Sequence, residues 1–252
     1  MLIGLVSDPD FIIKVAQGLV PGYSIVEKFG KNADIDGPVE AVWGGGGDYT
    51  GFDATAAETV TVVSSDTNDT ATGTGAQTVE LFGLDGAGAE ITETVSLSGA
   101  TPVTSTKSFL RCYRAVVRSA GSGDENAGVI TIAQSVTVAN VFAIIAVGDN
   151  QTMVAAYTIP AGKTGYLMGW GANFVNKTTG VSEVEIRIRP PGETFQLREA
   201  SSIHADGASR FDRKFILTKG PLAPLTDIKI MADSSVVNIG VGANFSILLV
   251  DN

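Results

Sequence analysis

Residues 182–189 read Ser-Glu-Val-Glu-Ile-Arg-Ile-Arg, in which apolar side chains alternate with charged ones. Successive side chains of a β-strand point to opposite faces of a sheet, so Val184, Ile186 and Ile188 would share one face. The charged side chains would share the other face. This alternation predicts a strand that is buried on one side only.

The sequence on both sides of this strand has the same organisation. Further strands are predicted over residues 153–159, 165–174, 210–217, 227–231 and 236–250, and a hairpin turn is predicted at residues 160–163. A dense series of short strands is typical of a sandwich or jelly roll. We therefore expect a jelly-roll-like β-sandwich over residues 149–252.

Residues 49–148 predict another β-sandwich. Strands are expected at residues 59–63, 78–81, 90–97, 109–118 and 128–132, separated by glycine-rich turns such as 83–88 and 120–124. The single cysteine, Cys112, falls in one of these strands, where a free thiol usually behaves as a small buried hydrophobe. The two blocks together predict an all-β chain.

Residues 1–48 differ from both blocks and predict an N-terminal extended arm. A short helix is expected near its start, with Asp8 as the cap, Pro9 at the first helical position and Gly18 as the stop. The glycines at 44–47 have little backbone restraint, so we expect them to form a hinge.

Four large aromatic residues stand out on this arm: Phe11, Tyr23, Phe29 and Trp43. The segment is too short and too broken to form its own core. Large apolar residues in such a setting usually dock on another surface. We expect that surface to be either the body of this protein or a partner.

Composition narrows the classes of function. The chain has 252 residues, 44% hydrophobic and 17% charged, so disorder of the whole chain is not expected. The net charge of −10 disfavours binding to nucleic acid or to an anionic membrane surface. The start of the sequence lacks the pattern of a secretory signal, and no window is long enough for a membrane span, which predicts synthesis in the cytoplasm.

Two motifs resemble ligand sites, and each has a plainer reading. Residues 161–164, Ala-Gly-Lys-Thr, end like a phosphate-binding loop, but the earlier glycine of that pattern is replaced by Tyr157. A turn between two strands explains them better. Asp66, Asn68, Asp69 and Asp85 carry oxygen ligands suited to calcium, yet their spacing fits a solvated turn. We expect no metal and no cofactor.

The residues with catalytic chemistry do not form a plausible active site in the sequence. Ser202, His204 and Asp206 lie close together, but no strained nucleophile turn accompanies them, so His204 is expected to be an exposed loop residue. A glycan hydrolase would need two carboxylates across a groove, and the candidates Glu90, Glu93, Glu183 and Glu185 look like ordinary strand-face residues. We expect no enzymatic activity.

The charged residues of the 182–199 region have two readings. Glu183, Glu185, Arg187, Arg189, Glu193, Arg198 and Glu199 are read first as a solvated sheet face with weak cross-strand ion pairs. The second reading is a specific contact between subunits.

Three segments resemble structural proteins of tailed-bacteriophage particles. They are residues 26–36 with Val42 and Trp43, residues 93–103 followed by Phe-Leu-Arg at 109–111, and the hairpin at residues 157–167. Within that setting the chain is most similar to a capsid cement or decoration protein. The resemblance implies a β-rich protein, often a homotrimer, that binds the major capsid protein on the outside of the virion and has no catalytic residues.

On this reading Phe11, Tyr23, Phe29 and Trp43 would anchor the arm to the capsid. The alternative is a tail or head-fibre adsorption protein that binds a host receptor or glycan. In that case Tyr166, Trp170 and the loops at 190–210 would supply a carbohydrate platform.

Overall fold

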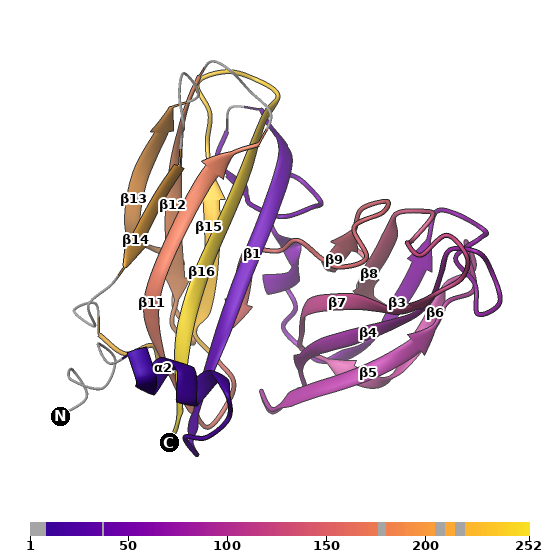
Figure 1. The fold of residues 1–252 in the computed structure, drawn as a ribbon, viewed down its shortest axis with the longest axis horizontal. Helices are drawn as coiled ribbons and strands as arrows, with labels where there is room; N and C mark the ends of the chain where they lie inside the picture. Colours follow the sequence, from indigo (N-terminus) through magenta and orange to yellow (C-terminus); the bar gives the residue numbers. More distant parts are fainter. Residues whose placement is uncertain (1–8, 37, 176–179, 205–209, 215–219) are drawn as a thin grey trace.

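The computed structural model describes residues 9–36, 38–175, 180–204, 210–214 and 220–252. These residues form mostly strands, which confirms the expected all-β class. The strands build two antiparallel sandwiches that lie side by side (Figure 1). The described residues begin and end in one of them, which we call the terminal sandwich. The strands between β2 and β10 form the other, which we call the inserted sandwich.

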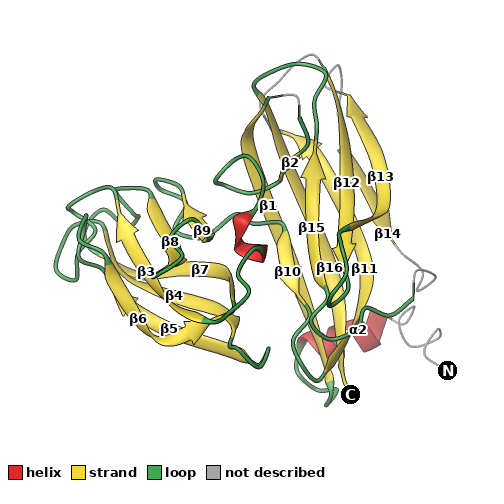
Figure 2. Cartoon of the chain, turned by 180° about the vertical axis from the view of Figure 1, so that it is seen from behind, coloured by secondary structure: helices red, strands yellow, loops and turns green. Residues whose placement is uncertain are grey.

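The terminal sandwich has a front sheet and a back sheet, seen from opposite sides in Figures 1 and 2. The front sheet has the order β1 (Tyr23–Ile35), β16 (Ile239–Asp251), β11 (Lys163–Phe174), β14 (Arg210–Lys214). The back sheet has the order β10 (Ala156–Thr158), β15 (Asp227–Ala232), β12 (Val181–Arg189), β13 (Gln196–His204), with β2 (Glu40–Ala41) also paired with β15. The expected extension of β14 to residue 217 lies outside the described residues.

The inserted sandwich also has two sheets. One has the order β6 (Val103–Phe109), β3 (Glu58–Ser64), β8 (Ile130–Gln134), β9 (Val141–Ile145). The other has the order β5 (Glu90–Ser96), β4 (Ala76–Leu84), β7 (Arg111–Ala120). A short 3-10 helix, η1 (Thr50–Phe52), precedes the first of these strands.

The alternating stretch at 182–189 forms β12 of the back sheet. Val184, Ile186 and Ile188 are buried in the core between the two sheets, as the period of two predicts. The core of the inserted sandwich is separate and contains Val60, Leu81, Phe109 and Phe142 among others. Cys112 is fully buried there, and this burial raises the pKa of its thiol to about 12.

The expectation of an extended arm over residues 1–48 is wrong for its larger part. Residues 23–35 form β1, which pairs with β16 from Tyr23 opposite Val250 to Ile35 opposite Ile239. Residues 40–41 form β2, which pairs with β15. The segment therefore completes both sheets of the terminal sandwich, because β16 and β15 need partners for their backbone hydrogen-bonding groups.

The expected helix is present as α2 (Pro9–Ala16) and lies across the front sheet (Figure 1). Phe11 and Val15, one helical turn apart, pack on Leu248 of β16. Gly18 follows the helix with φ of +71°, a conformation that ends helices and favours glycine. Asp8, the expected cap, lies outside the described residues.

The four glycines at 44–47 form a tight turn, and their expected role as a hinge is wrong. The indole Nε1 of Trp43 donates to the Gly46 carbonyl at 2.9 Å, and the Gly47 amide donates to a carboxylate oxygen of Glu40 at 2.8 Å. The Ala41 amide also donates to the Gly47 carbonyl at 2.8 Å. The Gly44 amide at the other end of the run donates to the Met153 carbonyl at 3.1 Å, so both ends of the glycine run are held by hydrogen bonds.

Candidate interaction surfaces and the seam between the sandwiches

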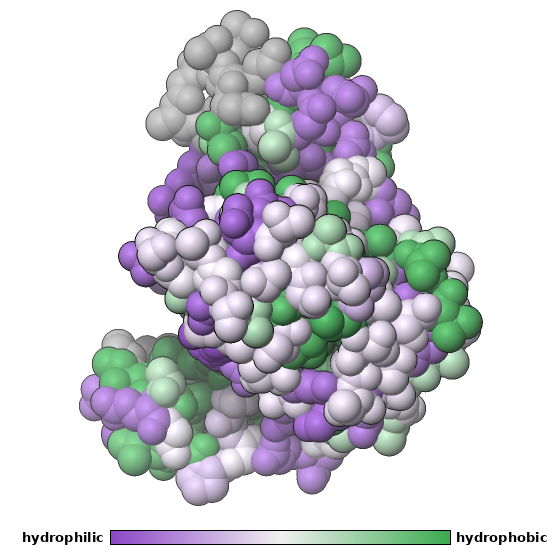
Figure 3. Space-filling view, turned by 90° about the vertical axis from the view of Figure 1, so that its right-hand side faces the viewer, coloured by the Kyte–Doolittle hydropathy of each residue, from purple (hydrophilic) through white to green (hydrophobic). Residues whose placement is uncertain are grey.

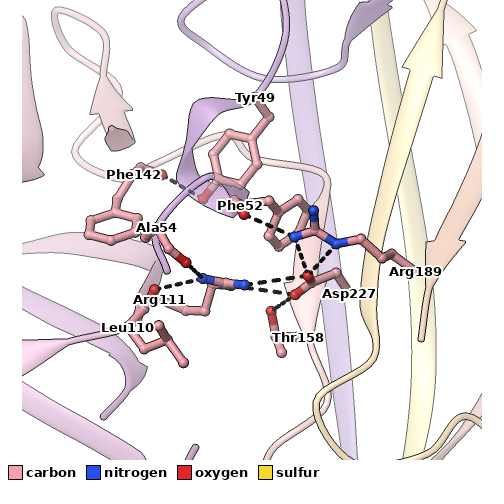
Figure 4. Close-up of polar contacts among 9 residues, drawn as sticks. All are labelled: Tyr49, Phe52, Ala54, Leu110, Arg111, Phe142, Thr158, Arg189 and Asp227. Atoms are coloured by element: carbon pink, nitrogen blue, oxygen red, sulfur yellow. Dashed lines mark hydrogen bonds and ion pairs between the residues drawn. The ribbon is translucent and has the colours of Figure 1, made fainter. Parts of the chain in front are cut away.

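Asp227, at the start of β15, lies at the centre of the contact between the two sandwiches (Figure 4). Its Oδ2 accepts hydrogen bonds from Nη2 and Nε of Arg189 at 2.6 and 3.0 Å. Its Oδ1 accepts one from Thr158 Oγ1 at 2.5 Å and a longer one from Arg111 Nε at 3.4 Å. Arg111 belongs to β7 of the inserted sandwich, so a single carboxylate joins the two parts of the molecule.

The two guanidinium groups are also held by backbone carbonyls near η1. Arg111 Nη1 donates to the carbonyls of Ala54 and Leu110, both at 2.9 Å, and Arg189 Nη2 donates to that of Phe52 at 2.9 Å. Both groups stack over the Phe52 ring, at 5.5 and 5.7 Å from its centroid. The Asp227 side chain is only 5% exposed, and a buried charge is tolerated only when it is paired and hydrogen-bonded in this way.

Lys28 of β1 makes a second polar link across the seam. Its Nζ is buried and donates to the carbonyl of Tyr113 on β7 at 2.6 Å, with the Tyr113 ring 5.3 Å away. Burial lowers the pKa of Lys28 to about 7, and the positive charge of Arg114 acts in the same direction. The amine at this contact therefore changes charge near neutral pH.

Aromatic rings fill the rest of the seam. Tyr113 of the inserted sandwich meets Tyr157 of the terminal sandwich edge to face, with centroids 4.7 Å apart. Tyr49 packs edge to face between Trp43 and Phe52, at 5.2 and 5.0 Å, and its hydroxyl donates to the Phe142 carbonyl at 2.8 Å. Each such ring pair contributes about 0.5–1.5 kcal/mol beyond its buried area. The seam thus combines apolar packing with hydrogen-bonded polar groups, while the buried Tyr157 hydroxyl has no hydrogen-bond partner among the residues that the structure describes.

Five exposed valines gather at one end of the terminal sandwich, which we call the valine tip: Val39, Val175, Val181, Val236 and Val237. The strand ends Ile35 and Ile239, paired across β1 and β16, mark this end. Backbone hydrogen bonds place the connecting segments together, since Ser235 N donates to the Val181 carbonyl and Val175 N to that of Gly240. Figure 3 shows green, hydrophobic residues exposed at this upper end of the molecule.

The structure places the four expected anchors in different surroundings. Phe11 and Trp43 are buried within the protein, and Tyr23 packs edge to face on Phe11 at 5.5 Å. Only Phe29 is exposed, at 42%. The role of Phe11 and Trp43 as partner-binding anchors is therefore corrected, because their apolar surfaces are buried inside the chain, whereas Tyr23 is only partly buried.

The acidic residues considered for calcium serve the backbone of the inserted sandwich. Asp69 is fully buried and accepts hydrogen bonds from Ser64 Oγ at 2.5 Å and from the amides of Ala76, Ala127 and Gly128 at 2.7, 2.8 and 2.9 Å. Asp66 and Asp85 cap turns, where their Oδ1 atoms accept from nearby backbone amides, as the turn reading predicted. Within the described ranges, no group of three or more His, Cys, Asp or Glu residues is placed to hold a metal ion.

The residues considered for a phosphate-binding loop, a catalytic triad and a carbohydrate platform are ordinary parts of the fold. Residues 160–163 form a turn between β10 and β11, with Gly162 at φ +74°. The expected hairpin is wrong, because β10 lies in the back sheet and β11 in the front sheet. His204 is exposed at the end of β13, and Asp206 lies outside the described residues. Trp170, proposed for a carbohydrate platform, is only 1% exposed and packs edge to face on Phe211, so it is not available to a glycan.

The charged residues around β12 form ion pairs within the chain. Arg187 Nη2 lies 2.5 Å from Glu185 Oε2 on the same strand, and Arg213 pairs with Glu199 across to the front sheet. Arg189 instead belongs to the Asp227 network. Glu90 and Glu93 lie on β5 of the inserted sandwich, whereas Glu183 and Glu185 lie on β12 of the terminal sandwich, so the four carboxylates do not share one sheet.

In the part of the chain that the structure describes, no helix has the length and apolar character needed to cross a membrane.

No protein-family profile matches this chain, and no curated protein matches it. Among solved structures, the chain is weakly similar to structures of infectious bursal disease virus. The crystal structure of its VP2 subviral particle shares 12% identity over 87% of this chain and 58% of that chain, with a TM-score of 0.23. This chain thus spans less than two thirds of that protein.

Two further structures of the same virus give similar values. The Gt strain shares 10% identity over 96% of this chain and 82% of that chain, with a TM-score of 0.21. The Gx strain shares 9% identity over 91% of this chain and 73% of that chain, with a TM-score of 0.24. All three likenesses are weak, and all three are to structures of one virus.

Proposed function

We propose that this chain is a structural protein of a tailed-phage virion that binds the outer capsid surface as a cement protein. In this role it stabilises contacts between neighbouring major capsid subunits. The observation that carries the proposal is the valine tip, an exposed apolar surface at one end of a body whose two sandwiches are joined by a buried network.

The valine tip has the composition of a protein-binding surface. Exposed apolar residues that gather in one place and have a polar rim mark sites of protein–protein contact. Four carboxylates, those of Asp34, Asp36, Glu183 and Asp233, lie among the same strand ends. Their charge favours a partner surface that is apolar at its centre and basic at its margin.

The seam supports the same role, because a cement protein must hold its partners at fixed positions. The Asp227 network, the Lys28 contact and the Tyr113–Tyr157 pair all cross from one sandwich to the other. A body tied in this way holds the inserted sandwich at a fixed position relative to the tip. The resemblance of three sequence segments to phage structural proteins supplies the virion setting.

The test is binding of the purified chain to DNA-free capsids of the phage that carries its gene, measured by co-sedimentation. The tip variant Val236→Asp with Val237→Asp is compared with a control, Val136→Asp with Val138→Asp, which changes two exposed valines between β8 and β9. We expect the tip variant to bind at least about tenfold more weakly, a loss of about 1.4 kcal/mol, and the control to bind like the wild type.

Equal binding by the tip variant and the wild type would show that the tip is not the docking surface. If the wild-type chain does not bind capsids but binds host cells, the adsorption function replaces the cement function. Circular dichroism of every variant confirms that the substitutions leave the fold intact.

A further inference from the structure

Lys28 lies on β1, the edge strand of the front sheet that is nearest to the inserted sandwich (Figure 1). It is opposite Phe245 of β16, a residue of the core, and Lys28 itself is buried. Its long side chain ends at the inserted sandwich, where Nζ donates to the Tyr113 carbonyl of β7. The hydrogen-bond acceptor of this amine therefore belongs to the other half of the molecule.

The surroundings of the amine suit an uncharged group. None of the ion pairs formed by the described residues includes Lys28. Its acceptor is a neutral carbonyl, and the Arg114 guanidinium acts on it with a charge of the same sign. An ammonium group here would be a buried charge without an anion, which is costly. The Tyr113 ring, 5.3 Å from Nζ, offsets only part of that cost.

Lys28 changes its charge at a pH where its titratable neighbours do not. Burial is the main cause that lowers the pKa of Lys28 to about 7. The other titratable side chains around it are Cys112 and Tyr113 of β7 and, beyond the Tyr113 ring, Tyr157 of β10 and Glu90 of β5. Burial raises the pKa of the Cys112 thiol to about 12 and also raises the pKa of both tyrosines. These three groups therefore keep their protons where Lys28 loses its own.

The seam is built so that it is able to open while both sandwiches stay folded. The inserted sandwich has a core of its own, and no sheet among the described residues contains strands of both sandwiches. A turn seats one sandwich on the other: the Ala161 amide donates to the Gly88 carbonyl at 2.8 Å, and a Cβ on Gly88 would lie 2.4 Å from Leu225 Cδ2. Opening of the seam thus breaks contacts of side chains and turns, and it leaves every sheet intact.

We infer that the protonation state of Lys28 controls how tightly the inserted sandwich is held against the terminal sandwich. When the seam opens, the amine leaves the Tyr113 carbonyl and enters water, where it binds a proton readily. The uncharged amine therefore favours the closed seam, and the protonated amine favours the open one. The inference does not rest on the proposed function, because no partner takes part in it.

The direction of the effect follows from the two proton affinities of the amine. Between a pKa of about 7 in the closed seam and 10.5 in water, the open form carries a proton that the closed form lacks. Each unit of rising pH in this range therefore favours closure by up to about tenfold. Below about pH 6 both forms carry the proton, so the seam is at its loosest there and no longer responds to pH.

The test is hydrogen exchange of the full-length chain between about pH 5 and 9, with each rate corrected for the intrinsic exchange rate at that pH. The Ala161 amide reports on the seam, because its acceptor lies on the other sandwich. The Ile230 amide, bonded to the Ala155 carbonyl, reports on the terminal sandwich, and the Leu97 amide, bonded to the Gln77 carbonyl, reports on the inserted one.

We expect the Ala161 amide to be less protected than the Ile230 and Leu97 amides, because the seam opens without unfolding either sandwich. Its protection should rise nearly tenfold from about pH 8 to 9 and change less than about twofold from about pH 5 to 6.

Three variants isolate the amine. Lys28→Met removes the titrating group, so the protection of the Ala161 amide should not change with pH. Lys28→Arg keeps a positive charge at every pH, so the protection should never rise above the low-pH value of the wild type. The matched control is Lys31→Met, which removes an amine from the opposite, outward side of the same strand and should behave like the wild type.

Titration of the Lys28 side chain by nuclear magnetic resonance tests the same group without any substitution. A Lys28 that titrates near 10.5 in the folded chain would overturn the inference. Equal protection of the Ala161, Ile230 and Leu97 amides would also overturn it, because the amine would then be exposed only by unfolding. So would an Ala161 amide whose protection depends on pH no more in the wild type than in Lys28→Met.

Discussion

Arg111 and Asp227 are 116 positions apart in the chain and lie on different sandwiches, yet they meet in an ion pair with Nε 3.4 Å from Oδ1. The pair is shielded from water, since the side-chain exposures are 11% and 5%. Because Arg189 and Thr158 bond to the same carboxylate, the stability of the seam depends on this one acidic group.

We expect Asp227→Asn to lower the free energy of unfolding by about 3–5 kcal/mol, because it leaves two largely buried guanidinium groups without their anion. The measurement is chemical denaturation followed by tryptophan fluorescence. The matched control is Asp212→Asn, whose partner Arg210 has a side chain that is 74% exposed. A surface pair of this kind contributes at most about 1 kcal/mol. Equal stabilities of the two variants would contradict the role assigned to Asp227.

The lowered pKa of Lys28 should make the free energy of unfolding depend on pH. Its pKa is about 7 in the folded chain, against 10.5 for an exposed lysine. Between these values the unfolded chain binds the extra proton, so stability rises with pH by up to about 1.4 kcal/mol per unit. Below pH 7 both states are protonated and the cost of burying the ammonium group is fully present.

The matched comparison is Lys28→Met, an unbranched side chain one atom shorter that removes the charge and the donor to the Tyr113 carbonyl. We expect this variant to lack the rise that the wild type shows between about pH 7 and 10, with unfolding measured at each pH. Parallel pH profiles of the two proteins would show that Lys28 keeps an ordinary pKa.

The Glu93 carboxylate should protect two backbone amides of the inserted sandwich from hydrogen exchange. Burial works to raise the pKa of its carboxyl, but hydrogen bonds from the amides of Thr106 and Lys107 and from the Thr106 hydroxyl outweigh it and hold the pKa below the usual value of 4.5. The carboxylate joins β5 to β6, with amide distances of 2.7 and 2.8 Å. The ionised Glu93 carboxylate therefore stabilises the folded protein at any pH above the pKa of this group in the unfolded chain. This stabilisation is lost as the pH falls through the lower pKa of Glu93 in the folded chain.

Hydrogen exchange of the Thr106 and Lys107 amides measures this contact directly. We expect faster exchange in Glu93→Gln than in the wild type at neutral pH, because the amide side chain accepts hydrogen bonds more weakly than a carboxylate. Amides of β8, which do not contact Glu93, should exchange equally in both. If the two amides keep their protection in the variant, Glu93 does not hold β5 to β6.

Replacing Asp69 should destabilise the folded protein more than replacing its neighbour Asp66. We expect Asp69→Asn to lower the free energy of unfolding by about 1–3 kcal/mol for each amide left without an acceptor. Asp66→Asn should be nearly neutral, because an amide oxygen is still able to accept from the Asn68 amide. Thermal unfolding of the two variants makes the comparison, and a greater loss in Asp66→Asn would reject this account of the loop.

The strands whose side chains follow a simple period were predictable from the sequence. β12 alternates in burial as the charged and apolar residues of 182–189 alternate, and the turn at Gly162 follows from its composition. These features depend on neighbouring residues alone, so a single sequence is enough to reveal them.

The strand β1 was missed because its inward face does not look apolar. Lys28, Gly30 and Asn32 point inward, while Phe29 points outward, which inverts the pattern expected of a core strand. Each of these polar side chains forms hydrogen bonds with another segment of the chain. Lys28 donates to the Tyr113 carbonyl, and Asn32 donates to Glu40 and to the Ala41 carbonyl. A Cβ on Gly30 would collide with the backbone at Ala155, so only glycine allows the close approach there.

The seam and the valine tip were not predictable for a related reason. Arg111, Arg189 and Asp227 lie in three separate strands, and nothing local to any of them indicates the other two. The five valines of the tip lie in four separate segments, one of them at the start of β12, until the fold brings the strand ends together. Contacts between distant segments require the topology, which the sequence pattern did not supply.

The measurement that tests the cement function most directly is cryo-electron microscopy of capsids mixed with the purified chain. The proposal predicts ordered density on the outer shell, with the valine tip against the major capsid protein and the inserted sandwich projecting away from it. Bare capsids, or density in which the tip points to solvent, would contradict it.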